Sequence, residues 1–408
     1  MYDSIKNTKI DWVLVITLLL LLIYGLVTVY SATFKSDQTQ FYNNFSKQIL
    51  WVLSGLVVCV VITLMPTSWL YSITPGLYSF FIILLLLLEF IPHSGGTTSR
   101  WFQLGSIQIQ PSEFMKPVMV LALARFLSKE THSPDKINNL FFVFLLVLFP
   151  FVLVLKQPDL GTSLAFLVLT IPMLYWRGLS GFIIFVICAP LVSFVAAFNF
   201  WTFFFAIILI SATLLYYHRG AIVFWLFFAL NISVGILAPV FWGKLHSYQQ
   251  QRILTFLGLV SDPHGVGYQI IQSKVAIGSG GLFGKGLLQG TQTQLRFLPA
   301  QHTDFIFSVL AEEWGFIGSL VVLVTFFIFL YRSTQIAAHT QNLFSSLLAI
   351  GAVTIFAFQV FVNIGMTLGI MPVTGLPLPF ISYGGSSMIS SMILAGLILN
   401  AAVRRFVY

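Results

Sequence analysis

Uninterrupted apolar runs recur from one end of this sequence to the other, and they constrain its fold more than any other feature. Charged residues make up 8% of the chain, whereas a soluble globular domain carries about 25%. A bilayer core about 30 Å thick is crossed by about 20 helical residues. The runs are continuously apolar rather than alternating, which favours helices over a β-barrel. The sequence therefore predicts an all-α polytopic integral membrane protein, with residues 1–408 forming a single membrane domain.

We expect about 12 transmembrane helices. The predicted spans are 12–33, 48–65, 70–91, 112–128, 139–156, 160–176, 180–198, 200–217, 221–242, 305–331, 345–370 and 379–402. The uncharged stretch 178–218 is too long for one span, and Pro190 and the Phe198-Asn199-Phe200 break divide it into two.

The distribution of Lys and Arg predicts the orientation, because cytoplasmic loops carry the excess of positive charge. An inside N-terminus places ten basic residues in the cytoplasm: Lys6, Lys9, Arg125, Lys129, Lys136, Arg177, Arg219, Arg332, Arg404 and Arg405. The short outer loops then hold four: Lys35, Lys47, Arg100 and Lys156. Both termini are thus predicted to be cytoplasmic. The net charge of +8 is explained by these span ends, and since no basic stripe exists we expect no nucleic-acid partner.

One long, Gly-rich polar loop, residues 243–304, stands out and is predicted to lie outside the membrane. Its cations suit an anionic headgroup, because ammonium and guanidinium groups and backbone amides all bind phosphate; they include Arg252, Lys274, Lys285 and Arg296. Asp262, in a Ser-Asp-Pro turn, is a candidate general base. Turn initiation explains it equally well. Residues 278–286 do not match a dinucleotide or phosphate-loop motif.

Charges at membrane depth are the second signal, since each costs about 2.5–3.5 kcal/mol on insertion scales. Most of them lie near the predicted outer ends of spans: Glu113, Lys116, Lys156, Asp159, Glu312 and Glu313. Helix N-capping is an alternative role for Asp159 and Thr303. For Lys116, a structural ion pair with an acid on another helix is at least as plausible as catalysis.

Several blocks of sequence, taken in order, resemble the shape, elongation, division and sporulation family. They are Arg100-Trp101, Gln110-Pro111-Ser112-Glu113 with Lys116, Gln157 through Ser163, Ser261-Asp262-Pro263 through Ser273, AIGSGGLFGKG, His302-Thr303-Asp304-Phe305-Ile306-Phe307, Glu312-Glu313, Asn363-Ile364-Gly365, Gly375 through Phe380, and Ser382-Tyr383-Gly384-Gly385. The AIGSGG form with Gly290-Thr291-Gln292 is more similar to the rod-shape members than to the division members.

The resemblance implies a peptidoglycan glycosyltransferase of the bacterial cytoplasmic membrane. Members polymerise lipid II, an undecaprenyl-diphosphate-linked disaccharide pentapeptide, on the outer face during elongation. They act with a class B penicillin-binding protein, a transpeptidase, among other elongation-complex membrane proteins.

The resemblance also assigns residues. The family's essential loop acid matches Asp262, and its structural Lys–Asp pair matches Lys116 and Asp159. The substrate-binding candidates are Arg252, Lys274, Lys285, His302, Thr303, Asp304 and Glu312. A divalent cation, Mg²⁺ or Mn²⁺, is a further expectation, although no oxygen-ligand loop identifies its site; no organic cofactor is expected.

Two departures from the family pattern stand out. Ala300 occupies the place where relatives usually have a Glu, two residues before His302. Relatives typically have ten spans, whereas residues 178–242 here are predicted to hold an extra helix pair beside the family's seventh helix.

Two other functions are compatible with the sequence. A lipid II flippase predicts polar residues along a path through both leaflets, whereas the polar residues here are biased to the outer side. A non-catalytic scaffold for a transpeptidase is the other alternative.

Overall fold

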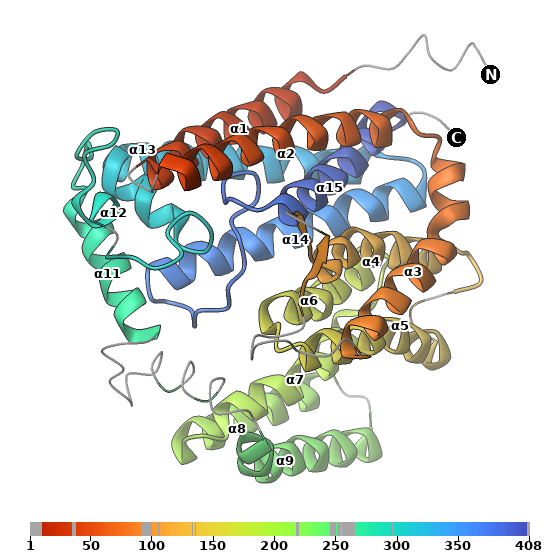
Figure 1. The fold of residues 1–408 in the computed structure, drawn as a ribbon. Coiled ribbons are helices and arrows are strands. Elements are labelled where there is room, and N and C mark those ends of the chain that lie inside the picture. The colour runs from red at the N-terminus through yellow and green to blue at the C-terminus, as the bar shows by residue number, and fades with distance from the viewer. Residues whose placement is uncertain are drawn as a thin grey trace. The chain divides into compact units, whose positions relative to one another are not determined.

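The computed structural model describes residues 10–34, 38–90, 100–104, 107–132, 134, 136–217, 220–244, 250, 254, 266–295 and 297–405. Almost all of its regular structure is helical (Figure 1). The first helices are α1 (Trp12–Thr33), α2 (Gln38–Leu64), α3 (Thr67–Phe90), α4 (Pro111–Leu127), α5 (Ile137–Lys156) and α6 (Leu160–Trp176). Then come α7 (Gly181–Ala196), α8 (Phe200–Tyr216) and α9 (Ala221–Lys244). The remainder are α11 (Val266–Ser279), α12 (Thr291–Gln294), α13 (Ile306–His339), α14 (Leu343–Thr367) and α15 (Gly385–Val403). A short antiparallel hairpin, β1 (Phe102–Leu104) and β2 (Ile107–Ile109), precedes α4.

Each of the twelve predicted apolar runs coincides with a helix, which confirms the helical membrane fold. Eight of the helices in the described part of the chain are long and apolar enough to cross a membrane. The helices α6, α7 and α8 are apolar but shorter. The number of spans stays a prediction.

Polar residues set several helix starts, because a side-chain oxygen satisfies an amide that has no partner inside the helix. Asp11 caps α1 by accepting from the Leu14 amide at 3.3 Å. Asn342 caps α14 by accepting from the Ser345 amide at 3.1 Å. Each cap therefore fixes where a long apolar helix begins.

The chain divides into two compact units, residues 1–177 with 261–408, and residues 178–260. In the larger unit α14 and α15 are central, since 78% and 72% of their apolar windows are buried, against 22% for α3. The helix α4 packs against α3, α6, α14 and α15. The outer faces of the peripheral helices carry exposed apolar side chains, which suit a hydrocarbon surrounding.

The smaller unit consists of α7, α8 and α9, which contact one another. A buried polar pair joins two of them: the Ser193 hydroxyl donates to Asn231 Oδ1 at 2.8 Å, and Asn231 Nδ2 donates to the Phe227 carbonyl at 2.8 Å. Both polar side chains are thus satisfied away from water, as a membrane interior requires. The three helices match the three predicted between residues 178 and 242.

The start of α1 and the end of α15 lie at the same end of the larger unit (Figure 1). Asp11, before α1, forms an ion pair with Arg332 near the end of α13 at 2.9 Å. Arg404, after α15, donates to the Thr63 carbonyl at the end of α2. Glu313 in the first part of α13 and Ser31 near the end of α1, by contrast, meet at the other end.

Candidate active site

Within the predicted loop 243–304, residues 266–295 pack on the first part of α13. That helix is broken at Gly315, whose φ of 67° and ψ of −163° are not helical. The amides after the break donate to the segment that follows α11, and amides of that segment donate to the carbonyls before the break. The four bonds are Phe316 N to Gly281 O (2.9 Å), Ile317 N to Leu282 O (3.1 Å), Lys285 N to Glu312 O (3.0 Å) and Gly286 N to Glu313 O (3.0 Å). They replace the i to i−4 bonds that an unbroken helix would make.

Glycine makes this close docking possible. A Cβ on Gly284 would lie 2.1 Å from the Glu313 carbonyl oxygen, and its φ is +80°. The left-handed φ is costly for a residue with a side chain. Gly284 therefore permits both the turn and the backbone-to-backbone contact.

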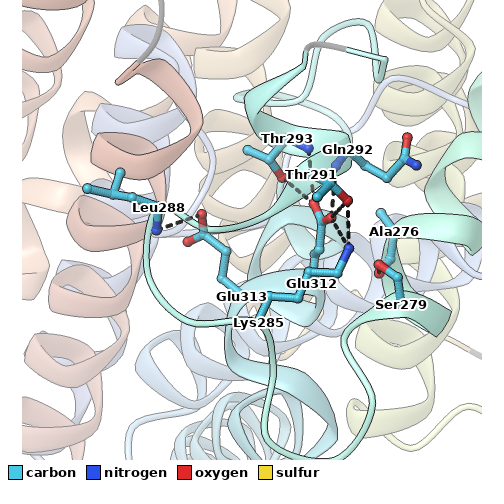
Figure 2. Close-up of polar contacts among 9 residues, drawn as sticks. All are labelled: Ala276, Ser279, Lys285, Leu288, Thr291, Gln292, Thr293, Glu312 and Glu313. Carbon is cyan, nitrogen blue, oxygen red and sulfur yellow. Dashed lines mark hydrogen bonds and ion pairs between the residues drawn. The ribbon is translucent and has the colours of Figure 1, made fainter.

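Glu312 is the centre of the polar cluster in this segment (Figure 2). Its side chain is completely buried and lies 2.8 Å from Lys285 Nζ. Besides Lys285, its two oxygens accept from Thr291 Oγ1 (3.3 Å), Gln292 N (2.9 Å), Thr293 N (3.0 Å) and Thr293 Oγ1 (2.8 Å). A buried carboxylate is stable only when it is paired and hydrogen-bonded in this way. Glu312 thus fixes Lys285 and the start of α12 at once.

Glu313, the next residue, holds a different part of the same segment. It is also buried and accepts from the Leu288 amide at 3.2 Å, as Figure 2 shows. It accepts a second hydrogen bond from the hydroxyl of Ser31 on α1. Leu288 has a φ of +65°, so the bond holds the backbone in a conformation that it would otherwise leave. The two glutamates together attach residues 285–293 to α13 and α1.

Residues 302–304 are attached to the C-terminal part of the chain through their backbone carbonyls. The His302 carbonyl accepts from Tyr383 N at 2.9 Å, and the Thr303 carbonyl accepts from Ser382 Oγ at 2.7 Å. The Asp304 carbonyl accepts from Asn363 Nδ2 at 2.9 Å. The His302 ring also meets the Tyr383 ring edge-on, with centroids 5.5 Å apart. Burial lowers the pKa of His302, because it disfavours the charged imidazolium.

The same C-terminal part contacts the backbone of α4 and of α6 close to the charges predicted there. Ser390 Oγ donates to the Glu113 carbonyl at 2.7 Å, and a Cβ on Gly161 would lie 2.6 Å from Leu376 Cγ. The helices α14 and α15 and the segment between them thus contact residues 113, 161 and 302–304.

The structure does not form the ion pair that we expect between Lys116 and Asp159. Within the described ranges, Lys116 pairs with Glu113 on its own helix, with 2.6 Å between Nζ and Oε2. Asp159 instead caps α6 through the Thr162 amide at 3.2 Å. Its other oxygen accepts from Gln110 Nε2 (3.0 Å) and Ser112 Oγ (3.3 Å). The charge of Lys116 is thus paired with Glu113, one turn away on the same helix. Asp159 connects α6 to the start of α4 through the neutral donors Gln110 and Ser112.

The capping roles considered for Asp159 and Thr303 have different outcomes. Asp159 is the N-cap of α6. Phe305, not Thr303, is the N-cap of α13, and it makes no side-chain cap. The Thr303 hydroxyl donates to the Ala300 carbonyl at 3.2 Å. Ala300 itself, at the position where relatives usually have Glu, has a φ of +52°.

The two lysines of this region differ in their ion pairing and exposure. Lys285 is committed to Glu312, and its side chain is 25% exposed. Lys274 on α11 is exposed and forms no ion pair among the residues that the structure describes. Its ammonium packs against Gly369, where a Cβ would lie 2.6 Å from Nζ. Of these two lysines, Lys274 is therefore the one without a carboxylate partner in the described part of the chain.

Three predicted residues, Asp262, Arg252 and Arg296, lie outside the described residues. Among the residues that are described, no group of three or more His, Cys, Asp or Glu side chains could hold a metal ion.

Sequence reasoning missed some residues of the cluster. Glu313 was singled out as a charge at membrane depth but not assigned to the site. Ser31 and Thr293 carry no such signal, since small hydroxyl residues are common in membrane helices and loops. Only the contact between α1 and α13 shows what Ser31 does.

Comparisons with known proteins identify the family of the chain. The cell cycle protein family that comprises FtsW, RodA and SpoVE matches residues 11–207 and 201–406. The chain is 36% identical to the peptidoglycan glycosyltransferase MrdB of Escherichia coli K12, over 98% of this chain and 95% of that protein. It is 33% identical to the peptidoglycan glycosyltransferase RodA of Treponema pallidum, over 97% and 98%.

Solved structures are similar over the same extent. A chain from work on "structural coordination of polymerization and crosslinking by a peptidoglycan synthase complex" has a TM-score of 0.73 and 30% identity, covering 98% of this chain and 99% of that one. The rod shape determining protein RodA of Thermus thermophilus has a TM-score of 0.64 and 27% identity, over 98% and 99%. The chain belongs to the FtsW, RodA and SpoVE family of cell cycle proteins.

Proposed function

We propose that this chain is a peptidoglycan glycosyltransferase, which polymerises lipid II into glycan strands during cell elongation. The observation that carries the proposal is the match along 98% of the chain to a relative that bears this activity in its name. The built polar cluster around Glu312 supports it, since a transferase acting on a diphosphate-linked sugar needs fixed charges in a water-poor setting.

The position of this cluster supports an extracytoplasmic reaction. Glu313 and Ser31 meet at the end of the larger unit opposite to Asp11, Arg332 and Arg404. If those basic residues mark the cytoplasmic side, the cluster faces outward. We place the protein in the bacterial cytoplasmic membrane with both termini in the cytoplasm.

In the proposed reaction, Asp262 is the general base. Its carboxylate takes the proton of the acceptor GlcNAc 4-hydroxyl while that oxygen attacks the anomeric carbon of the donor MurNAc. The bond from this carbon to the diphosphate oxygen breaks with inversion, and undecaprenyl diphosphate leaves with the electron pair. General base catalysis of this kind contributes about 10²–10⁴-fold.

The leaving diphosphate needs cations, and the structure distinguishes the candidates that it describes. Lys285 is already neutralised by Glu312, so we assign it to holding the segment in place. Lys274 has no carboxylate partner among the described residues, and we assign it to the diphosphate, with Arg252 and Arg296 as further candidates. His302, Thr303, Asp304 and Glu312 then shape the site rather than carry charge to the substrate.

A divalent cation, Mg²⁺ or Mn²⁺, stays part of the proposal as an aid to diphosphate departure. The described residues offer no ligand group for it, so no step is assigned to it. Dependence of polymerisation on added Mn²⁺ after chelation tests this expectation.

The proposed partner is a class B penicillin-binding protein, within a larger elongation complex. It is supported by the similarity to a chain from a structure that couples polymerisation to crosslinking. The two activities are expected to be separable, because the proposal assigns crosslinking to the partner.

The decisive experiment incubates the purified protein, with and without that partner, with fluorescent lipid II in vesicles. Glycan chains on a gel would support the transferase. Unchanged monomer that has redistributed between the leaflets would show a flippase instead. Unchanged monomer without redistribution, combined with stimulation of the partner's crosslinking, would show a scaffold.

A further inference from the structure

A pocket of about 240 Å³ lies between α3, α4 and α5, away from the cluster around Glu312. These three helices contact one another in the larger unit (Figure 1). The lining residues that matter here are Pro75, Ser79, Arg125, Phe126, Lys129 and Leu146. Arg125 and Lys129 belong to the end of α4 and the turn after it, whereas Ser79 and Leu146 lie well inside α3 and α5.

The position of Arg125 follows from a proline. Pro75 lies inside α3 and has no amide hydrogen, so the Tyr71 carbonyl four residues earlier loses its helical donor. Arg125 Nη1 supplies a hydrogen bond to that carbonyl and a longer one, 3.4 Å, to the Ser72 carbonyl. The guanidinium also stacks over the Tyr71 ring at 4.4 Å. Arg125 is thereby held at the mouth of the pocket.

No acid among the described residues neutralises this charge. The four ion pairs of the described chain involve other cations, and Glu113, Asp11, Glu89 and Glu312 are used in them. Two of the five guanidinium hydrogens, at most, are taken by the α3 carbonyls, so donors remain. Lys129, exposed beside Arg125, adds a second positive charge. A half-buried guanidinium and an ammonium on one rim are stabilised by an anion bound between them.

The charges of the pocket are gathered at one end, and the rest of its lining is mostly apolar, with the hydroxyl residues Thr74, Tyr78 and Ser79 among the apolar side chains. The charged rim lies at the end of the unit that holds Arg332 and Arg404, the side predicted to be cytoplasmic. Pro75 and Phe126 form apolar walls beside this rim, and Leu146, well inside α5, continues the wall toward membrane depth. Phe80 on α3 and Leu145 on α5, near the pocket residues in sequence, are 53% exposed, as expected of side chains that face hydrocarbon.

We propose that this pocket binds an anionic phospholipid of the cytoplasmic leaflet. Arg125 and Lys129 would bind the phosphodiester, and the apolar walls would take the first part of an acyl chain. A phospholipid fits better than a soluble phosphate, because a soluble anion gains nothing from the apolar walls. Basic pockets between transmembrane helices on this side are suited to such headgroups.

The test uses the full-length protein in nanodiscs of equimolar phosphatidylcholine and phosphatidylglycerol with identical acyl chains. Native mass spectrometry then measures the ratio of the two lipids retained. The wild type is expected to retain phosphatidylglycerol in excess. Lys129→Gln is expected to reduce that excess roughly fivefold, which is the change in binding expected for the loss of one cation near an anionic surface.

Two further variants separate the pocket from general charge. Lys136→Gln removes an exposed lysine from the same connection between α4 and α5, outside the pocket, and is expected to change nothing. Ser79→Phe fills the apolar end without altering charge, and is expected to lower phosphatidylglycerol retention. Neither residue makes a side-chain hydrogen bond among the described contacts, so folding, checked by melting temperature, is expected to be kept.

Equal retention of both lipids by the wild type overturns the proposal. So does an effect of Lys136→Gln as large as that of Lys129→Gln, or full retention by Ser79→Phe. Displacement of the retained lipid by inorganic phosphate at about 10 mM would also overturn the proposal. It would show that the pocket binds a soluble anion and not a phospholipid.

Discussion

Glu312 is a carboxylate whose position leaves it little freedom, since every acceptor direction is used by a donor from the same short segment. Such a group costs more to alter than a surface ion pair, because the donors left behind are buried. The exposure of Lys285, 25%, reduces the Coulombic part of that cost through solvent screening.

Glu312→Gln is expected to lower the free energy of unfolding by roughly 1–3 kcal/mol, the range for losing hydrogen bonds to a charged group. The measurement is thermal melting in detergent, repeated with Lys285→Gln and the double variant. A coupling between the two changes is expected, since both disturb one cluster. Strictly additive effects would show that the pair is not a unit.

Lys274→Gln is expected to reduce kcat for lipid II polymerisation by about 10²-fold, by removing a charge that stabilises the leaving diphosphate. The melting temperature should be unchanged, because Lys274 is an exposed residue and forms no ion pair among the described residues. Lys136→Gln, at the opposite end of the unit, serves as the matched control. A larger loss of kcat in Lys136→Gln than in Lys274→Gln would contradict the assignment.

His302 makes stability depend on pH. Burial lowers its pKa below the ordinary 6.5, so the unfolded chain binds a proton more readily than the folded one. Its contribution to stability is then complete above pH 6.5 and is lost as the pH falls from there through the lowered pKa. Melting temperatures between pH 7.5 and 5 should fall more steeply for the wild type than for His302→Asn. Identical slopes would contradict this.

At the scale of elements, the break in α13 is a built feature, since the segment after α11 replaces the helical bonds around Gly315. Two glycines of that segment allow a matched comparison. Gly284 has a positive φ and no room for a Cβ, whereas Gly281 has a φ of +56° with nothing within 4 Å of a Cβ.

Gly281→Ala is expected to cost about 1 kcal/mol, the cost of left-handed backbone alone. Gly284→Ala is expected to cost at least about 2 kcal/mol, since the new methyl meets the Glu313 carbonyl as well. Melting temperatures of the two variants measure the difference. Equal losses would mean that the segment does not dock on α13 as described.

The elements themselves were largely predictable, because apolar length and charge determine membrane helices directly. The docking of the segment after α11 on α13 was not predictable. AIGSGGLFGKG indicates turns, but nothing in it indicates that its amides satisfy carbonyls of a helix thirty residues away. Lys116 shows the same limit: the resemblance suggested Asp159 as its partner, while the helix offered Glu113 one turn away.

At the scale of the molecule, the two ends of the larger unit have different chemistry. The end with the termini holds Asp11–Arg332, Arg404 and the basic pocket at Arg125. The other end holds the buried carboxylates Glu312 and Glu313. The count of basic residues predicts the orientation of the helices, whereas the contacts that residues 31, 113, 302–304 and 382–390 make with distant parts of the chain depend on long-range packing.

The account's central claim is that this chain itself forms the glycosidic bond, with Asp262 as base. The most direct measurement is the initial rate of lipid II polymerisation by purified Asp262→Asn, with Glu130→Gln as a control at an exposed acid. We predict that Asp262→Asn loses about 10²–10⁴-fold in rate while it keeps its melting temperature and binds the transpeptidase, and that Glu130→Gln matches the wild type. Polymerisation by well-folded Asp262→Asn at the wild-type rate would contradict the claim.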